Sequence, residues 1–248
     1  MNVTESDSRL ATRLATEAGA LLLALQRSGQ LEGKALGAEG DSIANAFLMK
    51  ALRELRHDDA LLSEEEKDSP ARLQSKRVWI IDPLDGTREY GEGRSDWAVH
   101  VALAIDDVAT VGAVALPGLD LTLSSGNPLP LTLANTPLKM VVSRTRPAPE
   151  ALAVAKMLAA DLVPMGSAGA KAMAVVRGEA DIYLHSGGQY EWDNCAPVAV
   201  AKAAGLHCSR IDGSALVYNQ KDTYLPDILI CRTEMAEHVL EHIRSLNH

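Results

Sequence analysis

The chain has 248 residues, of which 47% are hydrophobic and 23% are charged, and its formal net charge is −9. These values are typical of a globular protein that is long enough to bury a substantial core. The negative charge argues against binding to nucleic-acid polymers or anionic membranes. No apolar run approaches the ~20 residues that a membrane-spanning helix needs. The polar stretch 1–9 does not resemble a secretory signal, and the three cysteines form no metal-binding cluster, so we expect a cytoplasmic protein with reduced thiols.

The first part of the chain combines two helical patterns with several short strands. Apolar residues recur at helical spacing over 6–28. The glycine-rich stretch 29–40 is interpreted as a loop, and a second amphipathic helix is predicted to begin at Asp41. Strands are then predicted over residues 60–62, 78–81, 97–105, 110–116 and 121–123. The third and fourth of these strands are expected to form a hairpin that turns at Asp106 and Asp107.

The segment 124–137 is rich in Gly, Pro, Asn and Ser, and we interpret it as a seam between two halves, 1–137 and 138–248. Beyond it, strand-like and helix-like segments alternate. The predicted strands are 141–142, 162–165 and 180–184, the predicted helices are 149–160, 168–176 and 193–204, and the segments 228–231 and 233–246 close the chain. This alternation predicts a layered α/β architecture with a mostly parallel or mixed sheet.

The run WIIDPLDGT is the most informative motif in the chain. Asp82 and Asp85 follow an apolar strand and lie three residues apart. Pro83 fixes the chain direction, and Gly86 permits a positive φ or a close approach to a ligand. Thr87 can cap a helix or place its hydroxyl beside a metal-bound water. Paired carboxylates of this kind suit Mg²⁺, although Asp-Gly is also a common turn dipeptide and an ordinary strand exit is the alternative.

Three further carboxylates stand at predicted element ends. Glu65 follows a short strand, Asp41 opens the second helix, and Asp193 opens a later helix. With the two motif aspartates they could hold two or more Mg²⁺ ions ~3.5–4 Å apart. Without metal such a cluster would repel itself, so its presence implies the cation. Each residue also has an ordinary interpretation, which is a solvated acidic run for Glu65 and a helix cap for the other two.

Taken together, these motifs resemble the lithium-sensitive, magnesium-dependent inositol monophosphatase superfamily, and within it the CysQ branch of 3′-phosphoadenosine 5′-phosphate phosphatases. The resemblance covers nearly the whole chain. It rests on Asp41, on the Ser-Glu-Glu run 63–65, and on the segments 79–87, 166–169 and 191–193, in that order. It implies an αβαβα sandwich of the sugar-phosphatase type, with most metal ligands in the first half.

The resemblance implies a role for each motif residue. Two or three Mg²⁺ ions would be held by Glu65, Asp82, Asp85 and Asp193 and by the backbone carbonyl of Leu84. Asp41 and Thr87 would orient and deprotonate the attacking water. The phosphate would be held by the backbone N–H groups of Gly86 and Thr87.

The sequence defines the substrate contacts less sharply. Arg144, which follows a strand, could bind a second phosphate in a fork geometry. Ser167 precedes a helix where backbone donors favour anions, and Lys171 either reaches an anion or is exposed. Glu191 either bonds the ligand or is a surface carboxylate, and Asp193 is expected at both metal and substrate.

Three other side chains have competing interpretations. His100 lies on an apolar strand and is interpreted as a hydrogen-bonded structural histidine. Tyr218 and Tyr224 are weak candidates for stacking a base.

The resulting hypothesis is a phosphatase acting through metal-activated water on 3′-phosphoadenosine 5′-phosphate, which gives AMP. The same metal core would also serve inositol monophosphate or fructose 1,6-bisphosphate. A non-catalytic nucleotide or metal sensor is the alternative of another class, against which the intact carboxylates and Thr87 count. The expected partner is a small phosphorylated molecule, and the sequence leaves a homodimer open. Sulfur assimilation is implied by the resemblance alone.

Overall fold

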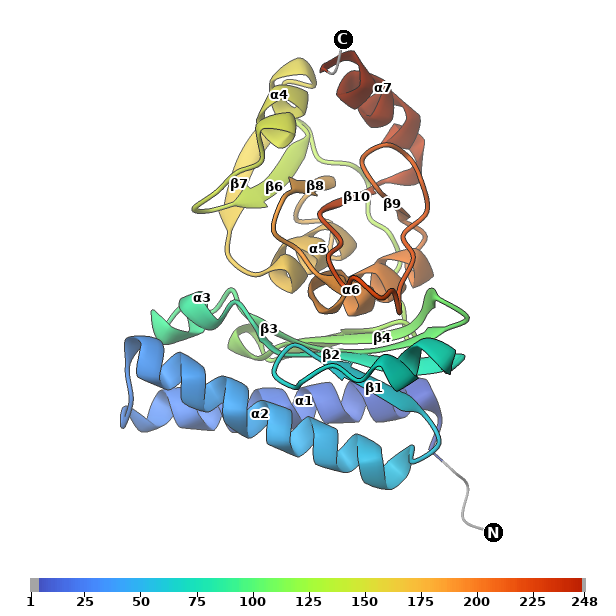
Figure 1. The fold of residues 1–248 in the computed structure, drawn as a ribbon. Helices are drawn as coiled ribbons and strands as arrows, with labels where there is room; N and C mark the ends of the chain where they lie inside the picture. Colours follow the sequence, from blue (N-terminus) through green and yellow to red (C-terminus); the bar gives the residue numbers. More distant parts are fainter. Residues whose placement is uncertain (1–4, 247–248) are drawn as a thin grey trace.

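The computed structural model describes residues 5–246, so residues 1–4 of the stretch that argues against a secretory signal lie outside it. Secondary-structure elements stack in five layers (Figure 1). The helical layers are α1 (Asp7–Ser28) with α2 (Gly33–Leu55), then α5 (Ala168–Val176) with α6 (Glu191–Ala203), then α4 (Pro149–Met157) with α7 (Ala236–Leu246). One five-stranded sheet lies between each pair of helical layers. This arrangement confirms the layered α/β sandwich expected from the sequence.

The first sheet has the strand order β1-β2-β3-β4-β5. Its strands are β1 (Ala60–Ser63), β2 (Arg77–Asp85), β3 (Ala98–Ile105), β4 (Val108–Leu116) and β5 (Leu121–Ser124). β1 and β2 pair in parallel, and the other pairs are antiparallel. The predicted β3–β4 hairpin is present, and both Asp106 and Asp107 have positive φ at its turn, as a tight hairpin requires.

The second sheet has the order β7-β6-β8-β10-β9. Its strands are β6 (Lys139–Ser143), β7 (Asp161–Met165), β8 (Ile182–Ser186), β9 (His207–Ser209) and β10 (Asp227–Cys231). β6 pairs in parallel with β7 and β8, whereas β10 is antiparallel to β8 and β9, so this sheet is mixed. Among the described residues, no helix has the length and apolar character needed to cross a membrane.

Each face of the first sheet packs against a different helical layer. Successive side chains of a strand point to opposite faces. Along β2, Trp79 and Ile81 pack with α1 and α2, and Val78 and Ile80 pack with the layer of α5 and α6. Gly112 lets α6 approach β4 closely, because a Cβ there would lie 2.5 Å from the carbonyl oxygen of a residue in α6. Small residues therefore build a tight central layer despite the low aromatic content.

Helix α2 begins at Gly33, eight residues earlier than the predicted start at Asp41. The glycines that indicated a loop instead serve helix packing. A Cβ at Gly37 would lie 2.7 Å from the Thr87 side chain, and one at Gly40 would lie 2.9 Å from Tyr90. Asp41 is consequently an interior helical residue rather than a cap.

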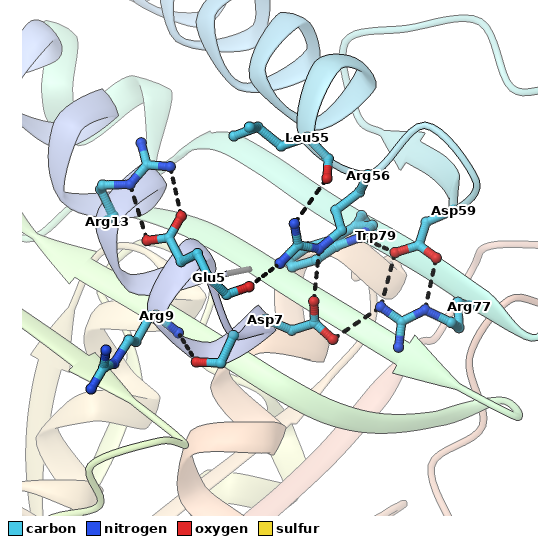
Figure 2. A network of polar contacts seen from close by, with 10 residues as sticks. Glu5, Asp7, Arg9, Arg13, Leu55, Arg56, Asp59, Arg77 and Trp79 are labelled. Carbon is cyan, nitrogen blue, oxygen red and sulfur yellow. Dashed lines mark hydrogen bonds and ion pairs between the residues drawn. The ribbon is translucent and has the colours of Figure 1, made fainter. Parts of the chain in front are cut away.

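A network of charged side chains ties the start of α1 and the end of α2 to the first sheet, as Figure 2 shows. Asp7 accepts hydrogen bonds from Arg56 at 2.8 Å and from Arg77 at 3.0 Å. Arg77 also donates twice to Asp59, which accepts a third bond from the indole N–H of the buried Trp79. Asp59 therefore satisfies a donor at the core boundary as well as a surface cation.

Replacing Asp59 with alanine should lower the free energy of unfolding by about 2 kcal/mol, because the Trp79 indole N–H loses its buried acceptor. Urea denaturation provides the measurement. Glu17→Ala is the matched control, since it removes an exposed pair with Arg13 that contributes about 0.5 kcal/mol or less. Equal losses in the two variants would contradict this role for Asp59.

Candidate active site

A β-bulge places both motif aspartates on one side of β2. Residues three apart on a regular strand face opposite ways. Here Asp82 pairs with His100 and Asp85 pairs with Ala98, so three steps along β2 match two along β3. The extra residue at the bulge, next to Pro83, turns Asp85 back to the face of Asp82. The local chain geometry thus converts an unfavourable spacing into a paired carboxylate site.

Asp193 joins these two aspartates from the other half of the molecule. It lies in the first turn of α6, where one carboxylate oxygen accepts the Tyr190 backbone N–H at 2.7 Å. Ligand atoms of Asp82, Asp85 and Asp193 all lie within 4.8 Å of one another. Carboxylates at this separation fit a hard divalent cation. The fold therefore brings together three of the predicted metal ligands into a group that could bind a metal.

The three aspartates differ in their electrostatic setting. Burial, together with the charges of Glu64 and Asp85, raises the pKa of Asp82 well above its usual range. Burial and the charge of Asp85 likewise raise the pKa of Asp193 to about 7. Burial acts in the same direction on Asp85, but the charge of His100 and bonds from Ser167 and Gly169 outweigh it and hold its pKa at about 2. Asp85 is the stable anion of the group.

Asp85 receives its hydrogen bonds from the start of α5. The Ser167 hydroxyl donates to Oδ2 at 2.5 Å, and the backbone N–H groups of Ala168 and Gly169 donate to Oδ1 and Oδ2 at 3.1 and 2.6 Å. Ser167 was predicted as a substrate contact. The structure places its hydroxyl on the side chain of Asp85, so it supports a predicted metal ligand.

Asp41 and Thr87 face one pocket of about 690 Å³ between α2 and the short helix α3 (Thr87–Gly91). Asp41 is buried, and its Oδ1 has no hydrogen-bond partner among the described residues. Burial and the charge of Glu65 raise the pKa of Asp41 to about 7, and the nearby Thr87 side chain opposes this shift. The Thr87 hydroxyl donates to the Leu84 carbonyl at 3.1 Å. A buried carboxylate oxygen without a donor is suited to a ligand or a water.

The two adjacent glutamates after β1 take different positions. The charge of Glu64 contributes to the raised pKa of Asp82 and Asp193. Glu65, the residue selected from the sequence, contributes through its charge to the raised pKa of Asp41, and it lines a separate groove along α2. The motif alone does not say which of the two glutamates acts on the three aspartates. The charge of Glu64 acts on Asp82 and Asp193, which favours Glu64 over Glu65 as a further carboxylate of this cluster.

Three residues predicted to contact substrate are engaged within the protein. The Arg144 guanidinium donates to Glu89 and Glu92 of the α3 region, both at 2.8 Å. Lys171 is buried and donates to backbone carbonyls of residues 166 and 167, and burial lowers its pKa to about 8. Glu191 is buried, and its two oxygens accept backbone N–H groups of residues 219 and 220 at 2.7 Å. These contacts hold loops around the site.

Two close neighbours of the carboxylates were not assigned a role there from the sequence. His100 is fully buried against Asp85, with Nε2 3.1 Å from Oδ2. Gly169 lies against the same imidazole, because a Cβ there would lie 2.1 Å from Nε2. The pairing of His100 with Asp82 across the sheet was the one signal available, and it depends on a strand register that the sequence does not reveal.

The five-layer sandwich, with a carboxylate cluster where strand β2 of the first sheet meets helix α6, defines a class of layered α/β proteins whose site could bind a divalent metal. The inositol monophosphatase family model matches residues 4–248, and the chain belongs to that family.

Individual relatives agree with this assignment. The chain is 48% identical to the 3′-phosphoadenosine 5′-phosphate phosphatase of Mycobacterium leprae, over 97% of this chain and 94% of the relative. It is 28% identical to the 3′(2′),5′-bisphosphate nucleotidase CysQ of Escherichia coli K12, over 75% and 80% of the two chains. Its fold resembles that of CysQ from Bacteroides thetaiotaomicron, with a TM-score of 0.75, 24% identity and coverage of 90% and 96%.

The raised pKa of Asp41 predicts a pH-dependent stability in metal-free protein. An unfolded aspartate titrates near ~3.9, whereas folded Asp41 titrates at about 7. Between these values the folded state keeps a proton that the unfolded state has lost, so Asp41 reduces stability as pH rises through this window.

In chelator, Asp41→Asn should therefore gain stability relative to the unmodified chain between about pH 4 and about pH 7, and the gain should then level off. Urea denaturation of both proteins across this range measures the difference. A difference that stays constant with pH would show that folded Asp41 titrates normally.

Proposed function

We propose that this protein is a magnesium-dependent phosphatase that removes the 3′-phosphate of 3′-phosphoadenosine 5′-phosphate to give AMP and inorganic phosphate. The observation that carries the proposal is the convergence of Asp82, Asp85 and Asp193 next to a pocket containing Asp41 and Thr87. The mycobacterial relative at 48% identity supports the choice of substrate through its own name.

The carboxylates would hold Mg²⁺ through Glu64, Asp82, Asp85 and Asp193, with the Leu84 carbonyl as a further oxygen. Bound Mg²⁺ supplies a Lewis acid that offsets phosphate charge and lowers the pKa of a coordinated water. Burial and the charges of neighbouring carboxylates both raise the pKa of Asp82 and Asp193. A bound cation would offset this and stabilise the charged forms. Oxygen-only donors at this separation favour Mg²⁺ over softer metals.

Asp41 would accept the proton of the attacking water. A general base is most effective when its pKa lies near the working pH, and the pKa of Asp41 is about 7. Its Oδ1 is buried and free of protein donors among the described residues. Thr87 would orient the water through its hydroxyl oxygen, which can accept a hydrogen bond because the hydroxyl donates its own hydrogen to the Leu84 carbonyl. The backbone N–H groups of Gly86 and Thr87, at the start of α3, would hold the phosphate, because first-turn amides lack helical partners.

An aromatic cluster beside Asp193 supports a ligand that carries a base. Tyr190 stacks on Trp192 with ring centroids 4.9 Å apart and an angle of 8° between the planes. Tyr224 meets Tyr190 edge-on at 5.5 Å, and both tyrosines are exposed. Nucleobases stack on exposed aromatic side chains, whereas inositol has no such surface. Tyr218, the other tyrosine considered from the sequence, is fully buried.

Asp41→Asn should lower kcat by about 10²–10⁴ while changing KM little, because the amide cannot take up the proton but occupies the same volume. Initial rates of phosphate release in Mg²⁺ measure both constants. Glu17→Ala, on the exposed face of α1, is the control and should behave as the unmodified chain. A near-normal kcat for Asp41→Asn would remove Asp41 from the mechanism.

Comparison of three substrates tests the proposed specificity. With Mg²⁺, phosphate release from 3′-phosphoadenosine 5′-phosphate should exceed that from inositol monophosphate and fructose 1,6-bisphosphate at equal concentration. Tyr190→Leu should raise KM for the nucleotide about tenfold, the effect of losing one stacked base, and leave the other two substrates unaffected.

Faster turnover of inositol monophosphate than of the nucleotide would instead support an inositol monophosphatase activity. Absence of phosphate release from all three substrates, despite Mg²⁺ binding, would support a sensor.

A further inference from the structure

We propose that His100 is a positioning residue that holds Asp85 of the first half in register with the start of α6, so that Asp85 and Asp193 meet at one metal site. The inference rests on the metal-dependent function proposed above. It concerns a side chain that sequence patterns identify only as a buried histidine.

The two ring nitrogens of His100 contact different halves of the molecule. Nδ1 lies 3.0 Å from the backbone carbonyl oxygen of Trp192, which can only accept, so Nδ1 carries a proton and donates. Nε2 lies 3.1 Å from Asp85 Oδ2, at an angle short of a straight hydrogen bond. The rigid imidazole thus spans from the end of β2 to the first turn of α6.

The contact with Trp192 bears directly on Asp193. The carbonyl of Trp192 belongs to the peptide unit that leads into Asp193, so fixing this carbonyl fixes the backbone that carries the carboxylate. The Asp193 side chain is held at its other side by the Tyr190 backbone N–H. These two contacts together determine where the third carboxylate points.

The contact with Asp85 gathers most of the protein's donors on one of its two oxygens. Oδ2 is met by three groups, which are the Ser167 hydroxyl, the Gly169 backbone N–H and His100 Nε2. Oδ1 accepts only the Ala168 backbone N–H, at 3.1 Å, among the described residues. Oδ1 therefore keeps a lone pair for a cation. Such outer contacts to ligating groups commonly alter metal affinity by 10–100-fold.

Gly169 provides independent support, because the chain leaves room for this imidazole. Any side chain at position 169 would place a Cβ 2.1 Å from Nε2. The first turn of α5 therefore contains a residue that lets the ring reach the Asp85 carboxylate. A histidine present only to fill the core would not need this gap beside its polar atom.

Mg²⁺ affinity of the chelator-treated, full-length protein tests the proposal, measured by isothermal titration calorimetry with Mg²⁺ as the only ligand. His100→Phe keeps a planar ring without donors and should weaken Mg²⁺ binding by about tenfold or more. His100→Gln can return a donor to Asp85 and should recover part of the loss. Val239→Ala, a cavity variant in the distant helix α7, controls for lost packing and should bind Mg²⁺ normally.

His100→Asn keeps the test decisive if the phenylalanine variant does not fold. Its amide can still donate to the Trp192 carbonyl but does not reach Asp85, so it should fold and bind Mg²⁺ about tenfold or more weakly. The role of His100 is overturned if folded His100→Phe or His100→Asn loses less than about tenfold in Mg²⁺ affinity, or if Val239→Ala loses as much affinity as they do.

The outcome also separates this inference from the proposed function. Failure of the unmodified protein to bind Mg²⁺ would refute the metal-dependent function itself. Normal Mg²⁺ binding and hydrolysis by the unmodified protein, with unchanged affinity in the His100 variants, would refute only the positioning role.

Discussion

Repulsion between carboxylates is the constraint on which the rest of the structure depends. Asp82, Asp85 and Asp193 are pressed together in a setting that burial makes unfavourable for charge, and they come from two layers, strand β2 of the first sheet and helix α6. The protein tolerates this because Asp85 is surrounded by donors from α5 and by His100, whereas the other two hold their protons more tightly. A bound cation would relieve the remaining repulsion, so the carboxylates that could hold a metal also determine how closely β2 and α6 approach.

Much of the fold follows from patterns in the sequence. The amphipathic period of α1, the apolar strands and the Asp106–Asp107 turn all reflect local rules, and the structure contains each of them. The start of α2 does not follow from such rules. Its glycines Gly37 and Gly40 favour a loop locally, but they allow contact with Thr87 and Tyr90, and that tertiary packing outweighs their poor helix propensity. The short helix α3 depends on the same contact.

The candidate site divides in a similar way. The carboxylates of the WIIDPLDGT run could be identified because aspartate side chains supply oxygen ligands that suit Mg²⁺. The structure places Asp193 close to them. The sequence could not show which of Glu64 and Glu65 acts on these aspartates, because that depends on the turn after β1. Arg144, Lys171 and Glu191 carry charges that suggest ligands, yet each is bonded within the protein, Arg144 and Glu191 to segments far away in sequence and Lys171 to carbonyls just before its own helix. A charged residue in the sequence shows that a side chain could bind a ligand. Only the fold shows whether that side chain is already bonded to another part of the protein.

The glycines of α2 limit which substitutions this chain can accept during evolution. Asp41 belongs to the same rigid helix, so the distance between that helix and α3 sets how far its carboxylate stands from Thr87. One added methyl group at position 37 or 40 would push α2 away from α3 and so move the Asp41 carboxylate relative to Thr87, with neither residue changed. The spacing of these two side chains thus depends on two residues that have no side chain.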